Sequence, residues 1–146
     1  MAILSNRAAG NRDGGIDVAL LILRLVLGLM ILLHGISKLP PPPPAAITGM
    51  LAHANLPAVL AWGVYVGEIV GPILLIVGVW ARLAAVLIAI NMVIALLVAH
   101  TGQVLSLNQQ GGYALELQAM YLFTAIALAL TGAGRFSVGG RYGPMN

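Results

Sequence analysis

Apolar residues are concentrated in four long stretches of the chain, and most polar residues lie at the two ends and in three connections. The stretches cover residues 16–39, 58–80, 83–100 and 113–131, and each is 18 to 24 residues long. A helix needs about 20 apolar residues to cross the hydrocarbon core of a bilayer. None of the stretches alternates with the period of two that marks a transmembrane β-strand. The pattern therefore predicts an all-α fold, a bundle of four transmembrane helices.

The first stretch follows two arginines, as the apolar region of a secretory signal does. Arg24 interrupts it, however, and prolines 40–44 follow it in place of a small-residue cleavage site. We therefore expect a retained helix that ends at the prolines, because proline lacks an amide donor and its ring clashes with the preceding turn. Residues 45–57 after the prolines are expected to contain a short interfacial helix, whereas no role is predicted for the Pro40–Pro44 loop itself.

Composition supports a membrane protein and excludes several other classes. Of the 146 residues, 60% are apolar and only 8% are charged, whereas a soluble domain has roughly 45–50% apolar and about 25% charged residues. The chain contains no cysteine, which excludes disulfides, thiolate catalysis and iron–sulfur ligation by this chain. No metal site and no nucleic-acid partner are predicted.

The basic residues predict the orientation of the helices. One side of the predicted bundle receives five arginines and the other only Lys38, and cytoplasmic loops carry the excess of basic residues. The sequence thus predicts a multi-pass protein of a bacterial inner membrane, with residues 1–15 and 132–146 as cytoplasmic tails. The five arginines are Arg7, Arg12, Arg82, Arg135 and Arg141.

Small residues on the second helix predict close helix packing. Gly63, Gly67 and Gly71 recur every four residues and so share one face, which lets a neighbouring helix approach closely. Packing within the bundle and packing between copies of the chain are both compatible with this pattern. Pro72 on the same helix leaves the carbonyl of Glu68 without its amide donor, which predicts a kink.

Three polar residues lie deep in the predicted helices, where a charge costs roughly 2.5–3.5 kcal/mol. At ~1.5 Å per residue, Arg24 lies about 12 Å and Glu68 about 18 Å from the cytoplasmic ends of their helices. Asn91 on the third helix lies at a similar depth. We therefore predict an Arg24–Glu68 ion pair with Asn91 beside it, which serves either to fix the helix register or a direct function.

A second polar group is predicted near the outer face. His34 and Lys38 are four residues apart on the first helix and so share a face. His100 ends the third helix on the same side, and Glu116 lies near the start of the fourth. These four residues form the candidate polar site, and the alternative is that they are interfacial residues whose polar ends extend to water.

Several short motifs follow one another along the chain: Arg24 to Gly28, His34 to Leu39, Leu56-Pro57, Glu68, Gly71, Gly78, Arg82, Asn91-Met92, Ala95, His100, Gly111 to Tyr113, Glu116 and Gly132 to Ser137. Their order and spacing resemble those of the DoxX-like family of small membrane proteins. The resemblance covers about residues 17–137 and implies four transmembrane helices and a link to quinone-dependent oxidoreductases, including relatives of a thiosulfate:quinone oxidoreductase subunit. The five-proline run is unusual for that family.

Two functions from different classes follow. The first is a quinone-interacting subunit of a redox membrane complex, in which His34, His100 and Glu116 exchange protons with the quinone. The alternative is a non-catalytic accessory subunit that packs against a larger respiratory or photosynthetic complex, or against further copies of the chain. Whether the chain is itself an enzyme stays open. Haem held by His34 and His100 is a minor hypothesis, and transport of a solute or proton ranks below it.

Overall fold

The computed structural model describes the backbone of residues 2–39 and 45–146, and the side chains from residue 14 onward within this part. Prolines 40–44, whose loop the sequence leaves without a role, lie outside the described residues. The described chain is helical apart from its turns and one isolated bridge between Leu107 and Tyr113, which confirms the all-α prediction. The elements are α1 (Ala2–Ser37), α2 (Ala45–His53), η1 (Ala58–Trp62), α3 (Gly63–Tyr65), η2 (Val66–Val70), α4 (Gly71–Val77), α5 (Ala81–Ala99), η3 (Thr101–Gln103) and α6 (Glu116–Thr131).

Three helical stretches are long and apolar enough to cross a membrane, namely Gly14–Ser37, Ala58–Val77 and Ala81–Ala99. The fourth predicted span is shorter than expected, because α6 begins at Glu116 and has 16 residues, a length of about 24 Å. Tyr113 belongs to the turn before α6 and bridges back to Leu107. The chain thus has three long apolar helices and a shorter fourth one.

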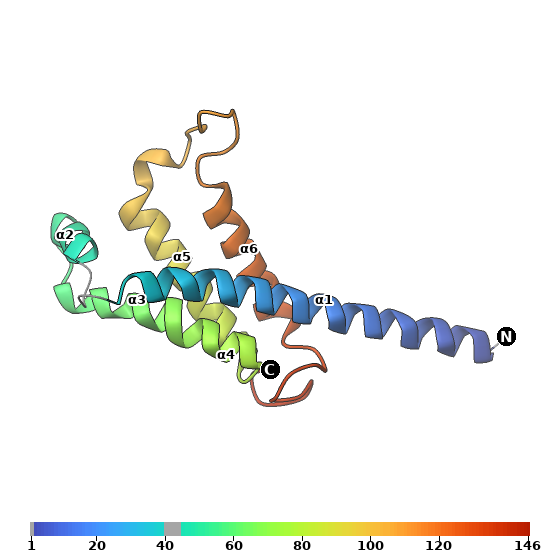
Figure 1. The fold of residues 1–146 in the computed structure, drawn as a ribbon. Helices are drawn as coiled ribbons and strands as arrows, with labels where there is room; N and C mark the ends of the chain where they lie inside the picture. The colour runs from blue at the N-terminus through green and yellow to red at the C-terminus, as the bar shows by residue number, and fades with distance from the viewer. Residues whose placement is uncertain (1, 40–44) are drawn as a thin grey trace.

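The first helix extends further toward the N-terminus than the sequence predicts. It begins at Ala2, so the segment 1–15, expected to be a tail, is helical over almost its whole length. In Figure 1 this end of α1 extends beyond the other helices. The helix ends at Ser37, just before the prolines that were expected to stop it.

The second span is irregular in the region where Pro72 was expected to bend it. It consists of a 3₁₀ turn, one α-turn, the π-helical segment η2 and α4. Pro72 is the second residue of α4, directly after η2. A π-turn accommodates the lost amide donor by moving the hydrogen bonds to more distant carbonyls, and the N–H of Gly71 accordingly bonds to the carbonyl of Val66. Glu68 lies within η2.

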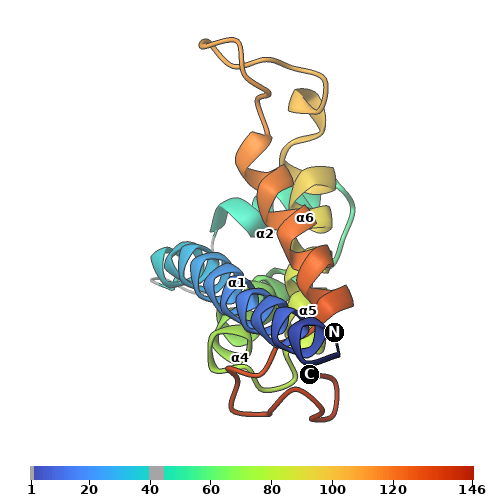
Figure 2. The ribbon, with the colours of Figure 1, turned by 90° about the vertical axis from the view of Figure 1, so that its right-hand side faces the viewer.

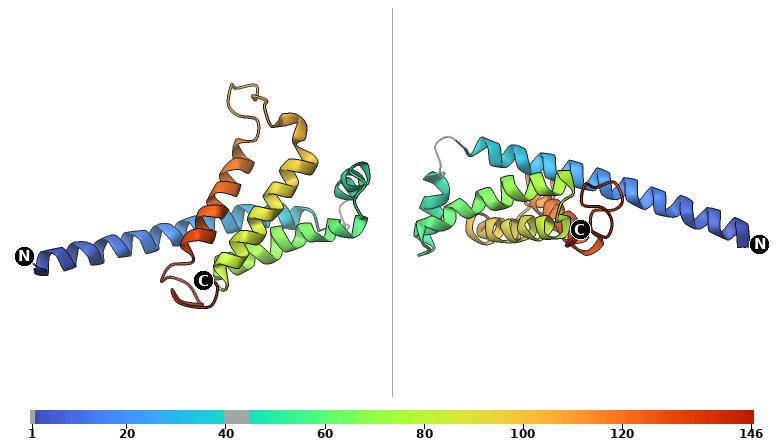
Figure 3. Two further views of the ribbon diagram at one scale, coloured as in Figure 1. Left: turned by 180° about the vertical axis from the view of Figure 1, so that it is seen from behind. Right: turned by 90° about the horizontal axis from the view of Figure 1, so that it is seen from below.

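The helices form two crossing pairs. In Figure 1, α1 and α4 run side by side, while α5 and α6 form a hairpin that crosses them, and Figures 2 and 3 show the same crossing from other sides. Alanines and large aliphatic residues share the centre where the four helices meet, and further large apolar side chains cover the outside, as a protein in lipid requires. The buried core consists of Leu27, Ile31, Leu75, Ala81, Ala84, Ala85, Ile88, Ala125, Leu128 and Ala133.

Glycines set the closest helix contacts, but not all of those predicted. A Cβ on Gly35 of α1 would overlap the backbone of Glu68, and one on Gly67 would overlap the side chain of Asn91. Gly71 packs against Ile88. Within the described chain, Gly63 does not make the predicted contact, because no atom lies within 4 Å of the place where its Cβ would be. Packing of Gly63 against another copy of the chain stays a prediction.

The segment 132–146 is packed against the helices, although the sequence predicts a tail. Asn146 is buried, and its side-chain oxygen accepts a hydrogen bond from the N–H of Ala81 at 3.0 Å. Its side-chain amide donates to the carbonyl of Gly140 at 2.6 Å. The segment therefore covers the turn between α4 and α5 at the start of the α5–α6 hairpin.

Candidate functional site

Arg24 and Glu68 do not form the predicted ion pair. The guanidinium of Arg24 is buried and donates only to backbone carbonyls in the part of the chain that the structure describes. Its Nε bonds to Leu75 at 2.9 Å and its Nη1 to Ala133 at 2.6 Å. Its other two bonds go to Ile76 and Phe136, at 3.1 and 3.0 Å.

The antiparallel register of α1 and the second span explains the difference. Gly35 of α1 lies against Glu68, and Gly28 lies against the carbonyl of Pro72. Arg24 comes eleven residues before Gly35, which is about 16 Å along the helix. The depths expected from the sequence put Arg24 and Glu68 at similar heights in the membrane. The true register differs, because neither the start of α1 nor the π-turn is evident from apolar periodicity.

Glu68 is instead paired with Lys38. The Lys38 ammonium donates to both carboxylate oxygens, at 2.5 and 2.6 Å. The Glu68 side chain is only 6% exposed, against 31% for that of Lys38. Asn91 donates to Glu68 Oε1 at 3.3 Å, so Asn91 is the neighbour of Glu68 that the sequence predicts. The hydroxyl of Tyr65 bonds to the backbone carbonyl of Lys38 at 2.9 Å and fixes the end of α1.

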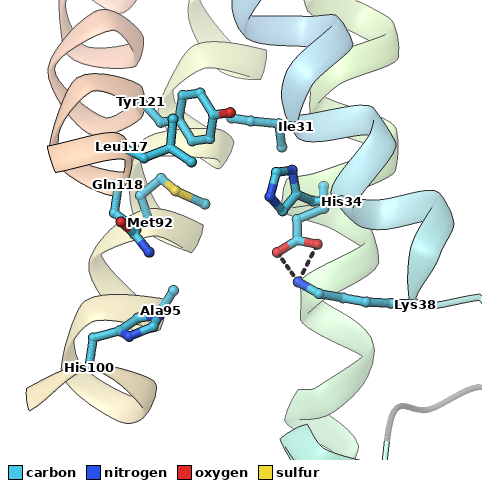
Figure 4. Close-up of a pocket in the computed structure, with 10 residues that line it drawn as sticks. Ile31, His34, Lys38, Met92, Ala95, His100, Leu117, Gln118 and Tyr121 are labelled. Atoms are coloured by element: carbon cyan, nitrogen blue, oxygen red, sulfur yellow. Dashed lines mark hydrogen bonds and ion pairs between the residues drawn. The ribbon is translucent and has the colours of Figure 1, made fainter. Parts of the chain in front are cut away.

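A cavity of about 120 Å³, the polar cavity, lies beside this ion pair. Figure 4 shows that His34 enters it from α1 and Lys38 from just after that helix, whereas Gln118 and Tyr121 enter it from α6 and His100 from just after α5. The rings of His34 and Tyr121 meet edge to face with their centroids 6.2 Å apart. The remaining lining residues are Ile31, Glu68, Met92, Ala95 and Leu117.

The structure brings together three of the four residues of the candidate polar site. His34, Lys38 and His100 all line the polar cavity. Glu116 does not line it, because this residue is exposed in the first turn of α6. Its Oε2 lies 3.0 Å from where a Cβ on Gly112 would be, so the carboxylate faces the loop before α6 rather than the helices.

A second and larger opening, the apolar cleft, has a volume of about 850 Å³. Apolar side chains from α2, η1, α3 and α5 line most of it, among them Leu51, Leu60 and Ile94. Its polar lining residues are Lys38, Glu68, Asn91 and His100. The apolar cleft and the polar cavity therefore share Lys38, Glu68 and His100, and the ion pair stands between the two.

The described residues do not bring three His, Asp or Glu side chains together as a metal site requires. His34 and His100 lie on opposite sides of the polar cavity (Figure 4), with Tyr121 against the His34 ring. The structure thus offers proton-bearing side chains and apolar volume.

Asp17 forms a second buried polar group that the sequence analysis did not single out. Its Oδ1 accepts hydrogen bonds from the backbone N–H of Arg135 at 3.0 Å and from Arg141 Nη2 at 2.9 Å. This carboxylate, mainly through the hydrogen bond and secondly through its charge, raises the pKa of Arg141. The contact places the start of the first span and the end of the fourth at the same end of the molecule, as an even number of spans requires. Which side of the membrane this end faces stays a prediction.

Two features of the site escaped sequence reasoning. Lys38 looks like an interfacial anchor because it follows the last apolar turn, and only the register set by Gly35 shows that it reaches Glu68. Tyr121 lies within an apolar stretch, where an aromatic residue is usually part of the packing. The available signal was the spacing of Gln118 and Tyr121, which are three residues apart and hence on one face of α6.

Comparisons with known proteins find a family model and a relative that match the chain. The family model described as DoxX matches residues 19–101, which include the second half of α1, the ion pair and α5. A protein of Haemophilus influenzae, described as uncharacterized, is 33% identical over 126 residues, which cover 84% of this chain and 90% of that protein. No solved structure matches the chain.

Proposed function

The chain belongs to the DoxX family, and from this premise we propose that it binds a membrane quinone in the apolar cleft as a subunit of a redox complex of the bacterial inner membrane. Its apolar helices make it a multi-pass membrane protein in contact with lipid. The proposal assigns the ring of the quinone to the end of the cleft where Lys38, Asn91 and His100 lie.

One observation carries the proposal: an apolar cleft in a membrane protein is lined by a few hydrogen-bonding side chains, namely Lys38, Glu68, Asn91 and His100. Ligand pockets are generally apolar with a few polar groups that fix the orientation of the ligand. A volume of about 850 Å³ is within the usual 300–1,000 Å³ for small-molecule sites. A quinone has the matching chemistry, since its two carbonyl oxygens accept hydrogen bonds and its tail is a hydrocarbon.

The residues at the polar end would bind and orient the ring. The Lys38 ammonium and the Asn91 amide are donors, and His100 donates or accepts according to its tautomer. Glu68 holds the ammonium in place through both carboxylate oxygens. The quinone supplies the redox chemistry, and the electrons come from a partner subunit, because the chain contains no cysteine to hold an iron–sulfur cluster.

Equilibrium binding in nanodiscs tests the proposal. Short-chain alkyl benzoquinones and naphthoquinones are titrated into the purified protein, and dissociation constants are measured for the wild type and for the Lys38→Met, Asn91→Leu and His100→Leu variants. We expect each variant to bind about tenfold more weakly, because a hydrogen bond to a charged or buried group contributes about 1.5 kcal/mol. Thermal unfolding of each variant verifies that it is folded.

Glu116→Gln is the matched control, since Glu116 lies outside both openings and its substitution should leave quinone affinity unchanged. Wild-type protein that binds neither quinone class would overturn the proposal. The alternative of a non-catalytic accessory subunit predicts that outcome, together with a smaller amount of a partner complex when the chain is deleted from the cell.

A further inference from the structure

The ion pair forms the wall between the two openings. Lys38, Glu68 and His100 line both the polar cavity and the apolar cleft. Glu68 is nearly buried while Lys38 is partly exposed. Both members of the pair therefore adjoin the cleft and the cavity, and either residue can exchange a proton with either opening.

The polar cavity has the size and the lining that buried water needs. Its volume of about 120 Å³ is several times the roughly 30 Å³ that one water molecule occupies in the liquid. A bound water needs two to four polar partners, and His34, Lys38, Gln118 and Tyr121 provide them. His34 Nδ1 lies 2.8 Å from the Met30 carbonyl. That carbonyl only accepts, so Nδ1 carries the proton and Nε2 is left for a water.

The cavity adjoins one end of the molecule. His34 lies in the last turn of α1 and Lys38 directly follows that helix. His100 follows the last residue of α5, and Gln118 lies in the first turn of α6. The ends of transmembrane helices lie where the bilayer meets water. Water therefore has a short path into this cavity, whereas the apolar cleft opens between apolar side chains.

We propose that the polar cavity is a water-filled path that carries protons between the Lys38–Glu68 pair and the aqueous phase at the His100 end. This inference rests on quinone binding in the cleft as the use for those protons. For each electron that the partner oxidoreductase delivers, a quinone carbonyl oxygen takes one proton from the pair. Water in the cavity then returns one proton to the pair, so charge and protons balance. When the reduced quinone is oxidised, it gives its protons to the pair, and the pair passes them to the water in the cavity.

Cysteine accessibility tests the path directly, because the chain has no cysteine of its own. Glu68→Cys, in the full chain in nanodiscs, is treated with a small cationic methanethiosulfonate reagent, which reacts with thiolates in contact with water. Two further substitutions each narrow one route to residue 68. Gln118→Trp adds bulk to the polar cavity, and Ile94→Trp adds bulk to the apolar cleft, since each residue lines only that opening.

We expect Gln118→Trp to slow the labelling of Glu68→Cys at least about tenfold and Ile94→Trp to leave the rate unchanged. The reverse pattern would show that water reaches residue 68 through the cleft and would overturn the proposal. If Glu68→Cys does not fold, Gln118→Cys is compared with Met120→Cys, which is 65% exposed on the same helix. Gln118→Cys should react at least tenfold faster, and equal rates would show a dry cavity. Labelling does not depend on quinone, so a path without quinone binding would overturn only the proposed function.

Discussion

Arg24 is a buried cation that backbone carbonyls stabilise in place of a carboxylate. Two of those carbonyls, of Leu75 and Ile76, lie at the end of α4, where the helix dipole carries partial negative charge. The other two, of Ala133 and Phe136, lie in the segment after α6. The Arg24 side chain therefore joins α1, the end of α4 and the segment after α6. Its planar guanidinium carries several N–H donors and so can bond to several carbonyls at once.

We predict that Arg24→Met lowers the free energy of unfolding by about 3 kcal/mol, because four carbonyls lose charge-assisted hydrogen bonds. Arg24→Lys should recover only part of this loss, since an ammonium lacks the fork. Denaturant unfolding in detergent micelles measures both effects. Leu23→Met, a change at an exposed position of the same helix, is the control. An Arg24→Met variant as stable as this control would contradict the structural role.

The ion pair of Lys38 with Glu68 is open to a double-mutant cycle. Lys38→Met leaves a nearly buried carboxylate with only Asn91 as a partner, whereas Glu68→Gln leaves an ammonium near the cavity. We expect the double variant to lose about 1–3 kcal/mol less stability than the sum of the two single variants. The same cycle with Lys38→Met and Glu116→Gln should be additive within about 0.5 kcal/mol. Additivity in the first cycle would show that the pair does not form.

At the scale of elements, glycine spacing decides which residues of α1 and the second span meet. Gly35 allows the backbones at Glu68 to approach, and this contact sets the register that brings Lys38 to Glu68. Ridges of larger side chains would hold the helices further apart. The site thus depends on a residue that has no chemical function of its own.

Gly35→Ala and Gly63→Ala make a matched pair, because both glycines are helical and only Gly35 is packed against another backbone. We predict that Gly35→Ala lowers the free energy of unfolding by about 2 kcal/mol, through overpacking. Gly63→Ala should raise it by about 0.5 kcal/mol, through helix propensity. Thermal unfolding of the two variants gives the comparison, and similar shifts of the same sign would count against the register described above.

The segment 132–146 is the second element whose position depends on single side chains. Asp17 holds it through Arg135 and Arg141. We predict that Asp17→Asn makes trypsin cleave after Arg141 about tenfold faster. A loss of about 1.4 kcal/mol in the free energy of local opening raises the fraction of molecules with segment 132–146 detached about tenfold. Limited proteolysis followed by mass spectrometry measures the rate. An unchanged rate, equal to that of Glu116→Gln, would show that Asp17 does not secure the segment.

At the scale of the whole molecule, the pattern of apolar residues predicts where the helices lie in the sequence, but it predicts few of the contacts between them. Runs of apolar residues locate α1, the second span and α5, since helix length in a membrane is set by bilayer thickness. The pairing of Arg24 with carbonyls was not predictable, because it depends on where residues 132–146 fold. The Lys38–Glu68 pair depends on register, which small residues and a π-turn determine, and apolar periodicity does not reveal either. His34, Lys38 and His100 were predictable as a group because helix ends on one side gather at one interface.

At the scale of the whole molecule, the apolar cleft and the polar cavity adjoin the same ion pair, Lys38 with Glu68. The apolar cleft and the polar cavity meet only where Lys38, Glu68, His100 and Ala95 line both. Charge within a membrane is costly, and this arrangement concentrates it where the two openings meet. The central claim is therefore the position of a quinone ring at that meeting point.

Photolabelling with a quinone analogue tests that position most directly. An alkyl benzoquinone that carries an azide on its ring is bound to the wild-type protein in nanodiscs and irradiated, and the labelled peptides are identified by mass spectrometry. The account predicts labels in residues 63–68 and 87–100, and their loss when excess unlabelled quinone is present. Labels spread over the outward face of α6, unaffected by excess quinone, would contradict it.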